Sequence, residues 1–275
     1  MSCSLIEMRL VLVVLTTFLV PLAGCVDSPA ETDSFRLGTT TSMRDSGLLD
    51  ILIEDFKRVH DIDVEYVAVG TGAALELGRN GDVDALIVHA PEQEAKFIEE
   101  GFADERVPIA RNAFVLLGPG TWDGSIFETF TSILENETCF ISRGDNSGTH
   151  AKEQAIWRHI NQTQDVEMVE DSNGYHPPGD WYFSIGQGMG AAINMADEKN
   201  CATFSDRGTA LQFQSNIDLE RTEFSDSIVD NPYAYLVIQP GNATAAHTFE
   251  SYLLNEGRRL IANYTINGEH PFFVN

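Results

Sequence analysis

Apolar residues along the chain fall into two alternating patterns, which predict strands and amphipathic helices in turn. Four short apolar runs in the first half predict strands, at 35–38, 62–69, 85–88 and 112–117. Between the first two runs, apolar side chains recur at helical spacing, at Leu48, Leu49, Leu52, Phe56 and Val59. Further helices are expected to start at 73–77 and to cover 92–100. This alternation predicts an α/β fold with a mainly parallel sheet.

The same pattern starts afresh after Gly118-Pro119-Gly120. A strand is expected at 139–142, a helix at 151–160 and a returning strand at 235–238. The chain would leave its first body near 113–118 and come back with the returning strand, so the two crossings would form a hinge. The expected limits are 35–115 plus 235–275 for lobe 1, and 116–234 for lobe 2.

Residues 1–25 differ from the rest of the chain. Met8-Arg9 is followed by an apolar run from Leu10 to Leu22 and then by Ala23-Gly24-Cys25. The run is shorter than the roughly 20 residues that span a bilayer, so it predicts a signal peptide with a lipoprotein cleavage site. Cys25 would carry the lipid anchor, and 26–34 would be a flexible tether. The remaining chain is expected at the extracellular face of the cell membrane.

The net charge of the chain limits the kinds of molecule that it is expected to bind. The net charge is −25, and the acidic residues are spread through patterned segments rather than gathered in a tail. Such a surface repels nucleic acid and anionic membranes, so no nucleic-acid partner is expected. It also favours a salt-adapted, halophilic protein, because the Debye length falls to about 3 Å in 1 M salt.

The cysteines and sequons leave several alternatives open. Cys3 would leave with the signal peptide, and Cys139 and Cys201 remain as either a disulfide or two buried thiols. Four Asn-x-Thr sequons allow surface glycosylation, at Asn136, Asn161, Asn242 and Asn263.

Three turns share one design, in which a strand ends, a run rich in Gly, Ser and Thr follows, and a helix begins. They are Gly38-Thr39-Thr40-Thr41-Ser42, Val69-Gly70-Thr71-Gly72 and Ser142-Arg143-Gly144-Asp145-Asn146-Ser147-Gly148-Thr149. Glycine allows close approach of the backbone, and hydroxyls and helix-start N–H groups donate hydrogen bonds. Each turn alone is also ordinary capping chemistry. Together, beyond the carboxyl ends of strands, they predict an anion site.

Arg143 supplies the positive charge that a buried dianion needs, since a guanidinium can hold two oxygens at once. Its alternative role is a salt bridge to Asp145. That same carboxylate could accept a proton from phosphate, which keeps a phosphate site open.

Other chemistries find little support in the sequence. Gly70-Thr71-Gly72-Ala73-Ala74-Leu75 lacks the third glycine of a dinucleotide fingerprint, and no Walker lysine or zinc motif is present. His89 with Glu92 could bind a metal, but a histidine at a strand end is more often a hydrogen-bonding residue. Ser147 is not in a nucleophile elbow, so an extracellular hydrolase is kept only as an alternative of a different class.

At the same turns, the chain resembles the tungstate-binding proteins of ABC transporters, relatives of the molybdate, sulfate and phosphate binders. The resemblance covers roughly residues 35–240 and is carried by Thr39-Thr40-Thr41-Ser42, 67–82, Val88-His89-Ala90-Pro91, 142–149, Trp181-Tyr182, 186–190, Asp206-Arg207 and Asn231-Pro232-Tyr233. His150 and Ser184 depart from the usual pattern of the family.

The resemblance implies a two-lobed periplasmic-binding-protein-like fold of type II, with the ligand in a cleft between the lobes. It implies a non-enzymatic solute-binding protein that captures tungstate, or alternatively molybdate, sulfate or phosphate, and delivers it to an ABC transporter permease. A monomer without cofactor or metal is expected. The expected ligand contacts are Thr40, Thr41, Ser42, Thr71, Gly72, Arg143, Ser147, Gly148 and Thr149.

Overall fold

The computed structural model describes residues 33–240 and 243–274. The predicted signal peptide, the predicted lipid-anchor site Cys25, most of the predicted tether and the sequon at Asn242 lie outside the described residues. In the part that is described, no helix combines the length and the apolar character needed to cross a membrane.

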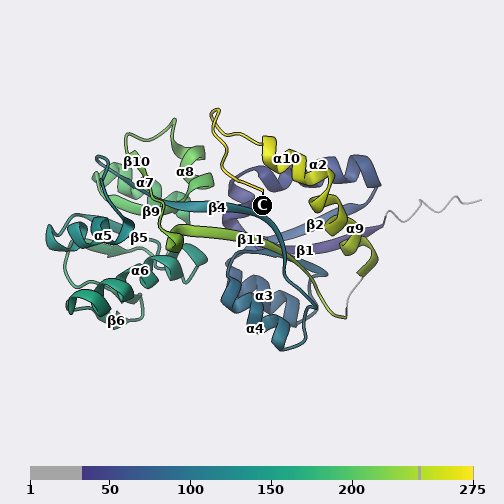
Figure 1. Cartoon of the computed structure of the whole chain (residues 1–275), viewed down its shortest axis with the longest axis horizontal. Helices are drawn as coiled ribbons and strands as arrows, with labels where there is room; N and C mark the ends of the chain where they lie inside the picture. The colour runs from purple at the N-terminus through teal and green to yellow at the C-terminus, as the bar shows by residue number, and fades with distance from the viewer. Residues whose placement is uncertain (1–32, 241–242, 275) are drawn as a thin grey trace, which may run out of the picture. The chain divides into compact units, whose positions relative to one another are not determined.

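A mixed sheet runs through the described chain, in the order β2-β1-β3-β11-β4-β9-β5-β8, with β10 paired to β4 (Figure 1). Its strands are β1 (Ser34–Thr40), β2 (Asp63–Val69), β3 (Ala85–Val88), β4 (Val107–Gly118), β5 (Phe140–Ser142), β8 (Tyr182–Ser184), β9 (Ala202–Asp206), β10 (Glu220–Glu223) and β11 (Asp230–Val237). A separate hairpin pairs β6 (Val169–Asp171) with β7 (Gly174–His176).

Helices connect most of these strands. They are α1 (Thr41–Asp45), α2 (Leu48–His60), α3 (Thr71–Arg79), α4 (Pro91–Glu99), α5 (Ile126–Glu135), α6 (Gly148–Gln164), α7 (Met189–Lys199), α8 (Arg207–Phe213), α9 (Ala243–Leu254) and α10 (Glu256–Asn263). The predicted segments up to 100 agree closely with α2, α3, α4 and the first three strands.

The sheet is mixed rather than mainly parallel. β1 runs parallel to β2 and β3, and β5 runs parallel to β8 and β9. β4 and β11 instead pair antiparallel with each other and with their outer neighbours β9 and β3. The two long strands lie side by side in the middle of the sheet (Figure 1). Antiparallel neighbours need no helical crossover, so the alternation of strands and helices did not reveal this pairing. The α/β class is confirmed.

Aromatic side chains dominate the core on both sides of the two central strands. Phe56 packs edge to face on Phe249 with ring centroids 4.8 Å apart, between α2 and α9. Beyond β4, Phe130 of α5 packs on Trp157 of α6, with ring centroids 4.7 Å apart. Each fully buried side chain of this size stabilises the fold by about 1.5–3 kcal/mol.

None of the predicted segments corresponds to α5, α7, α8, α9 or α10. α5 nevertheless carries a readable start signal, a capping box in which Ser125 accepts from Glu128 N and the Glu128 carboxylate accepts from Ser125 N. In α8 the residues Arg207 to Leu211 are all buried, so the helix lacks the alternation of apolar and exposed polar faces that identifies an amphipathic helix.

Cys139 and Cys201 form a disulfide, with their Cα atoms 4.8 Å apart. The two cysteines precede the neighbouring parallel strands β5 and β9, whose pairing brings them together. The bond closes a loop of sequence separation 62 and decides between the two alternatives that the sequence left open.

Replacing both cysteines by serine should lower the free energy of unfolding by about 2–4 kcal/mol, because the unfolded chain regains the entropy of the closed loop. Urea unfolding of the Cys139→Ser/Cys201→Ser variant measures the loss. The wild type under a reducing agent is the matched control and should lose a similar amount. Equal stability of all three samples would contradict the structural role of the bond.

Glu153 of α6 is a buried carboxyl that ties this helix to β5 and β8. It accepts hydrogen bonds from Ser142 Oγ at 2.8 Å, Trp157 Nε1 at 3.2 Å and Tyr182 OH at 2.6 Å. Burial raises its pKa to about 7, although the three donors act in the opposite direction. The folded protein therefore holds a proton on this group at pH values where the unfolded chain has lost it.

The variant Glu153→Gln should remove a pH-dependent part of the stability. The unfolded pKa is about 4.3, so the wild type loses up to about 4 kcal/mol relative to the variant as the pH rises from that value through the folded pKa. Glutamine has the same shape and keeps the bonds from Tyr182 and Trp157. Denaturant unfolding of both proteins over this pH range measures the difference, and a constant difference would show that the folded pKa is not raised.

Candidate anion-binding site

The predicted turns meet where strands of the two halves of the sheet end. β1, β2 and β3 are parallel neighbours, so their carboxyl ends lie at one edge and present the turns that follow them. The turn at 142–149 comes from the other half, between β5 and α6. Together they enclose a small cavity.

The cavity has about 190 Å³ of space between protein atoms, part of which is open to solvent, and it is lined by Thr40, Thr41, Ser42, Val69, Gly70, Thr71, His89, Arg143, Ser147, Gly148 and Thr149. Every predicted contact residue except Gly72 is part of this lining. Gly72 lies one residue further into α3, whose first residue is Thr71. Gly70, Val69 and His89 line the cavity without having been predicted as contacts.

Two helices of full length begin at the cavity. α3 starts after Gly70, which provides no side-chain cap, so N–H groups of its first turn keep no side-chain partner. α6 starts after Ser147, whose hydroxyl accepts from His150 N at 3.3 Å. Helix N-termini attract anions because their N–H groups point outward and the helix dipole is positive there.

Thr71 carries the clearest sign of a missing acceptor. Its side chain is 2 % exposed, and its Oγ1 has no hydrogen-bond partner among the described residues. Leaving a buried hydroxyl unpaired costs about 1–3 kcal/mol. A ligand oxygen in the cavity would satisfy it.

Arg143 is buried and paired with Asp145. Its Nε and Nη2 donate to Asp145 Oδ2 at 3.1 and 2.5 Å, and Asp145 Oδ1 accepts from Ser147 N at 3.2 Å. Arg143 therefore forms the salt bridge that the sequence allowed. This pair uses only some of the five N–H donors of the guanidinium. The same arginine lines the cavity, so it can serve both partners.

His89 follows β3 and forms part of the cavity wall. Its Nδ1 lies 2.6 Å from Asn231 Oδ1 and its Nε2 lies 3.4 Å from Ser42 Oγ. Burial lowers its pKa to about 4, so the imidazole is neutral at neutral pH. Within the described residues, no cluster of three or more His, Cys, Asp or Glu side chains could hold a metal ion.

Hydroxyl groups join His89 to the central strands. Ser42 Oγ lies 3.1 Å from both Thr40 Oγ1 and Tyr233 OH, and Tyr233 also receives a long hydrogen bond from Asn231 Nδ2 at 3.5 Å. Asn231 and Tyr233 belong to β11, so the site is bonded directly to a strand at the centre of the sheet.

A wider opening of about 690 Å³ adjoins the cavity. It shares Thr41, Gly70, Arg143 and Ser147 with the cavity and adds Arg44, Asp45, Asp145, Gly188, Met189, Gly190 and Ala191. Asp145 therefore faces this opening and not the inner cavity.

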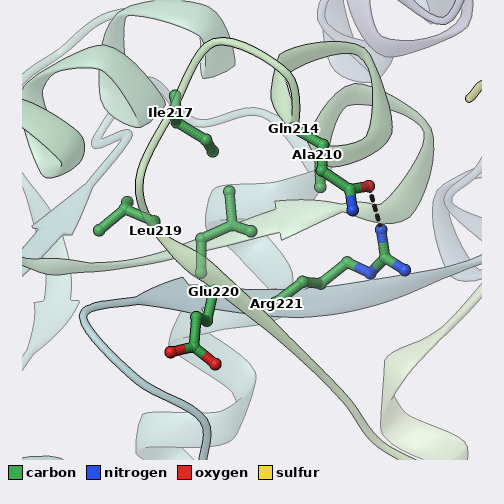
Figure 2. Close-up of a pocket in the computed structure, with 7 residues that line it drawn as sticks. Ala210, Gln214, Ile217, Leu219, Glu220 and Arg221 are labelled. Carbon is green, nitrogen blue, oxygen red and sulfur yellow. Dashed lines mark hydrogen bonds between the residues drawn. The ribbon is translucent and has the colours of Figure 1, made fainter.

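A cavity of about 750 Å³ lies elsewhere, between β10 and α8 (Figure 2). Its one cationic lining residue, Arg221, donates to Gln214 Oε1 at 2.9 Å and forms ion pairs with Glu223 and Glu269. The arginine is engaged by three protein groups, so this cavity offers no charge to an anion.

The chain matches the family model described as PBP superfamily domain over residues 27–256. A candidate ABC transporter anion-binding protein of Haloferax volcanii is 36% identical over 92% of this chain and 75% of its own length. The tungstate-binding protein TupA of Peptoclostridium acidaminophilum is also 36% identical, over 88% of this chain and 85% of its own length.

Solved structures agree. The tungstate-binding protein TupA of Desulfovibrio alaskensis G20 matches with a TM-score of 0.73 and 31% identity, over 88% of this chain and 99% of that one. The molybdate-binding protein of Azotobacter vinelandii, at 14% identity and a TM-score of 0.62, shares the fold alone. The expected two-lobed fold of type II is confirmed. The chain belongs to the PBP superfamily, and within it to the family of the tungstate-binding proteins of ABC transporters.

Proposed function

We propose that this chain captures tungstate outside the cell and delivers it to the permease of an ABC importer. The observation that carries the proposal is the small cavity lined almost entirely by hydrogen-bond donors, with the unpaired Thr71 hydroxyl and the Arg143 guanidinium in its wall. Tungstate is preferred over molybdate because TupA relatives bind tungstate; the two anions have the same charge and nearly the same size.

The donors favour a fully ionised tetrahedral anion. A protonated phosphate would need an acceptor for its proton, and the carboxylate considered for that role, Asp145, accepts from Arg143 and Ser147 and faces the outer opening. A dianion would exchange its water for hydroxyls, helix-start N–H groups and the charged arginine, each charge-assisted bond contributing about 1.5–3 kcal/mol.

Capture would proceed by closure of lobe 1 (35–115 plus 235–275) on lobe 2 (116–234), with β4 and β11 as the connection. Turns from both halves contribute to one cavity, so an anion bound there holds them together. The closed form would be what the permease recognises, and hinge closure of this kind needs no chemical step.

The surroundings of the protein follow from the sequence. We propose a monomer that is exported by the signal peptide, tied to the membrane by a lipid on Cys25, and adapted to concentrated salt. The net charge of −25 supports salt adaptation, because screening would let an anion approach an acidic protein.

A hydrolase is the second candidate, and one arrangement invites it. The contacts of His89 with Ser42 on one side and Asn231 on the other place the three residues in the positions of a base, a nucleophile and a residue that orients the base. The separation of 3.4 Å between Ser42 Oγ and His89 Nε2 is long for a nucleophile and its base, and Ser42 Oγ lies closer, at 3.1 Å, to both Thr40 Oγ1 and Tyr233 OH. Turnover of an ester panel would be required to revive it.

Replacing Arg143 by alanine should weaken tungstate binding by about 100-fold or more, because two charge-assisted bonds are lost and Asp145 is left unpaired. Calorimetric titration in high salt with tungstate, molybdate, sulfate and phosphate measures the effect. Arg259→Ala, at an exposed position of α10, is the matched control and should bind like the wild type. No heat from the wild type with any of the four anions would refute anion capture.

Replacing Gly148 by alanine should impair closure. A Cβ on Gly148 would lie 2.7 Å from His89 Cε1, so the turn at 142–149 and the wall after β3 could not approach as closely. An overpacked contact costs about 1–3 kcal/mol, which corresponds to binding that is weaker by roughly fivefold to 140-fold. Gly120→Ala is the control, because no atom lies within 4 Å of the added Cβ. Unchanged affinity of the Gly148 variant would show that the two walls do not need this contact.

A further inference from the structure

His89 is the titratable side chain of the cavity wall to which anion capture has so far assigned no role. It is 8 % exposed and lies between three parts of the chain. Ser42 comes from the turn after β1, Asn231 and Tyr233 come from β11, and Gly148 comes from the start of α6. The imidazole therefore contacts elements from both halves of the molecule.

The hydrogen bond to Asn231 decides which ring nitrogen carries the proton. An amide oxygen only accepts, so the 2.6 Å contact places the proton on Nδ1 and leaves a lone pair on Nε2. Stacking on Tyr233, with ring centroids 4.7 Å apart, holds the ring in this orientation. The lone pair is then on the side of Ser42 and the cavity.

The charges around His89 keep it neutral in the empty protein. Burial is the main cause of its low pKa, the bond to Asn231 opposes it, and the cations Arg143 and Lys152 lower it further. The positive charge of Lys152 is in turn partly offset by the carboxylates of Glu92 and Asp230.

Two further carboxylates lie near these charged groups. Asp145 is already paired with Arg143. Asp206 is a buried carboxyl that acts on Tyr233 and is not among the groups that shift the pKa of His89.

A dianion changes this balance. It brings two negative charges into a buried cavity whose one cationic lining residue, Arg143, already shares its charge with Asp145. Opposite charges within about 4–6 Å shift a pKa by about 1–3 units toward the charged form. The imidazole is the neutral group of the lining that can become a cation near neutral pH.

We propose that His89 is a proton-linked ligand of the anion: when a dianion enters the cavity, Nε2 takes up a proton from the solvent and donates it as a hydrogen bond to an anion oxygen. The inference rests on the proposed capture of an oxyanion. Nδ1 keeps its bond to Asn231 throughout, so the ring gains a positive charge without moving. One proton is then bound with each anion.

The pH dependence follows from the sign of the shift. The pKa of His89 is higher in the bound state than in the free state, so binding is favoured as the pH falls. The gain in affinity from protonation is complete below the pKa of His89 in the free state, about 4. It is lost as the pH rises through the pKa of His89 in the bound state. Between the two pKa values the dissociation constant should rise by up to about tenfold for each unit of increase in pH.

Calorimetric titration of the full chain with tungstate, in buffers of different ionisation enthalpy, counts the protons directly. The wild type should take up roughly half to nearly one proton per anion at about pH 5 and almost none at about pH 8.5. His89→Asn keeps an N–H in the place of Nδ1 for Asn231, and His89→Gln puts an amide in the place of Nε2. Both variants should bind tungstate without proton uptake.

His150→Gln is the matched control, since His150 is also buried near Arg143 but does not line the cavity. Its proton uptake should equal that of the wild type. If either His89 variant fails to fold, nitrogen NMR of the wild-type imidazoles gives the same answer, because Nε2 of His89 should change from a bare to a protonated nitrogen on addition of tungstate.

The outcomes separate the two proposals. Absence of binding heat from the wild type with every anion would refute capture itself. Binding without proton uptake, or uptake that persists in both His89 variants, would overturn the role of His89 and leave capture intact.

Discussion

The replacement of water around an oxyanion is the constraint on which the rest of the structure depends. An anion that enters this small, mostly buried cavity leaves most of its hydration shell behind, and each lost hydrogen bond has to be made again by the protein. No single turn offers enough donors. The fold solves this by bringing the starts of α3 and α6 and the hydroxyls after β1 to one point, which requires strands from both halves of the sheet to end there.

The two central strands connect this point to the rest of the molecule. β11 supplies Asn231 and Tyr233, which are bonded to His89 and Ser42 in the cavity wall. β4 supplies Asn112, which donates to the buried Asp206 at the start of α8. Asn231 and Tyr233 of β11 therefore each lie one hydrogen bond from a residue that lines the cavity. A change at the cavity wall can reach this central strand through direct contacts.

The net charge of the whole chain is opposite in sign to the charge at the cavity. Over the whole chain the balance is strongly acidic, yet at the cavity the protein presents Arg143, helix N-termini and neutral hydroxyls. Pairing with Asp145 keeps the buried guanidinium in place when the cavity is empty, because an unpaired buried charge is costly. The same pairing weakens its field at the ligand. A neutral histidine that can charge beside a dianion would offset that loss.

The sequence by itself determined the α/β class, the first strands and helices, and the three Gly/Ser/Thr turns with Arg143, because hydrophobic period and turn chemistry are local properties. It also carried the family resemblance. Tertiary structure alone decided the antiparallel pairing of β4 with β11, the disulfide between Cys139 and Cys201, the replacement of Gly72 by Gly70 in the lining and the entry of His89 into the wall. Each of these depends on which distant segments become neighbours, and burial in the assembled core is what gives His89 a neutral imidazole. No pattern along the chain contains that information.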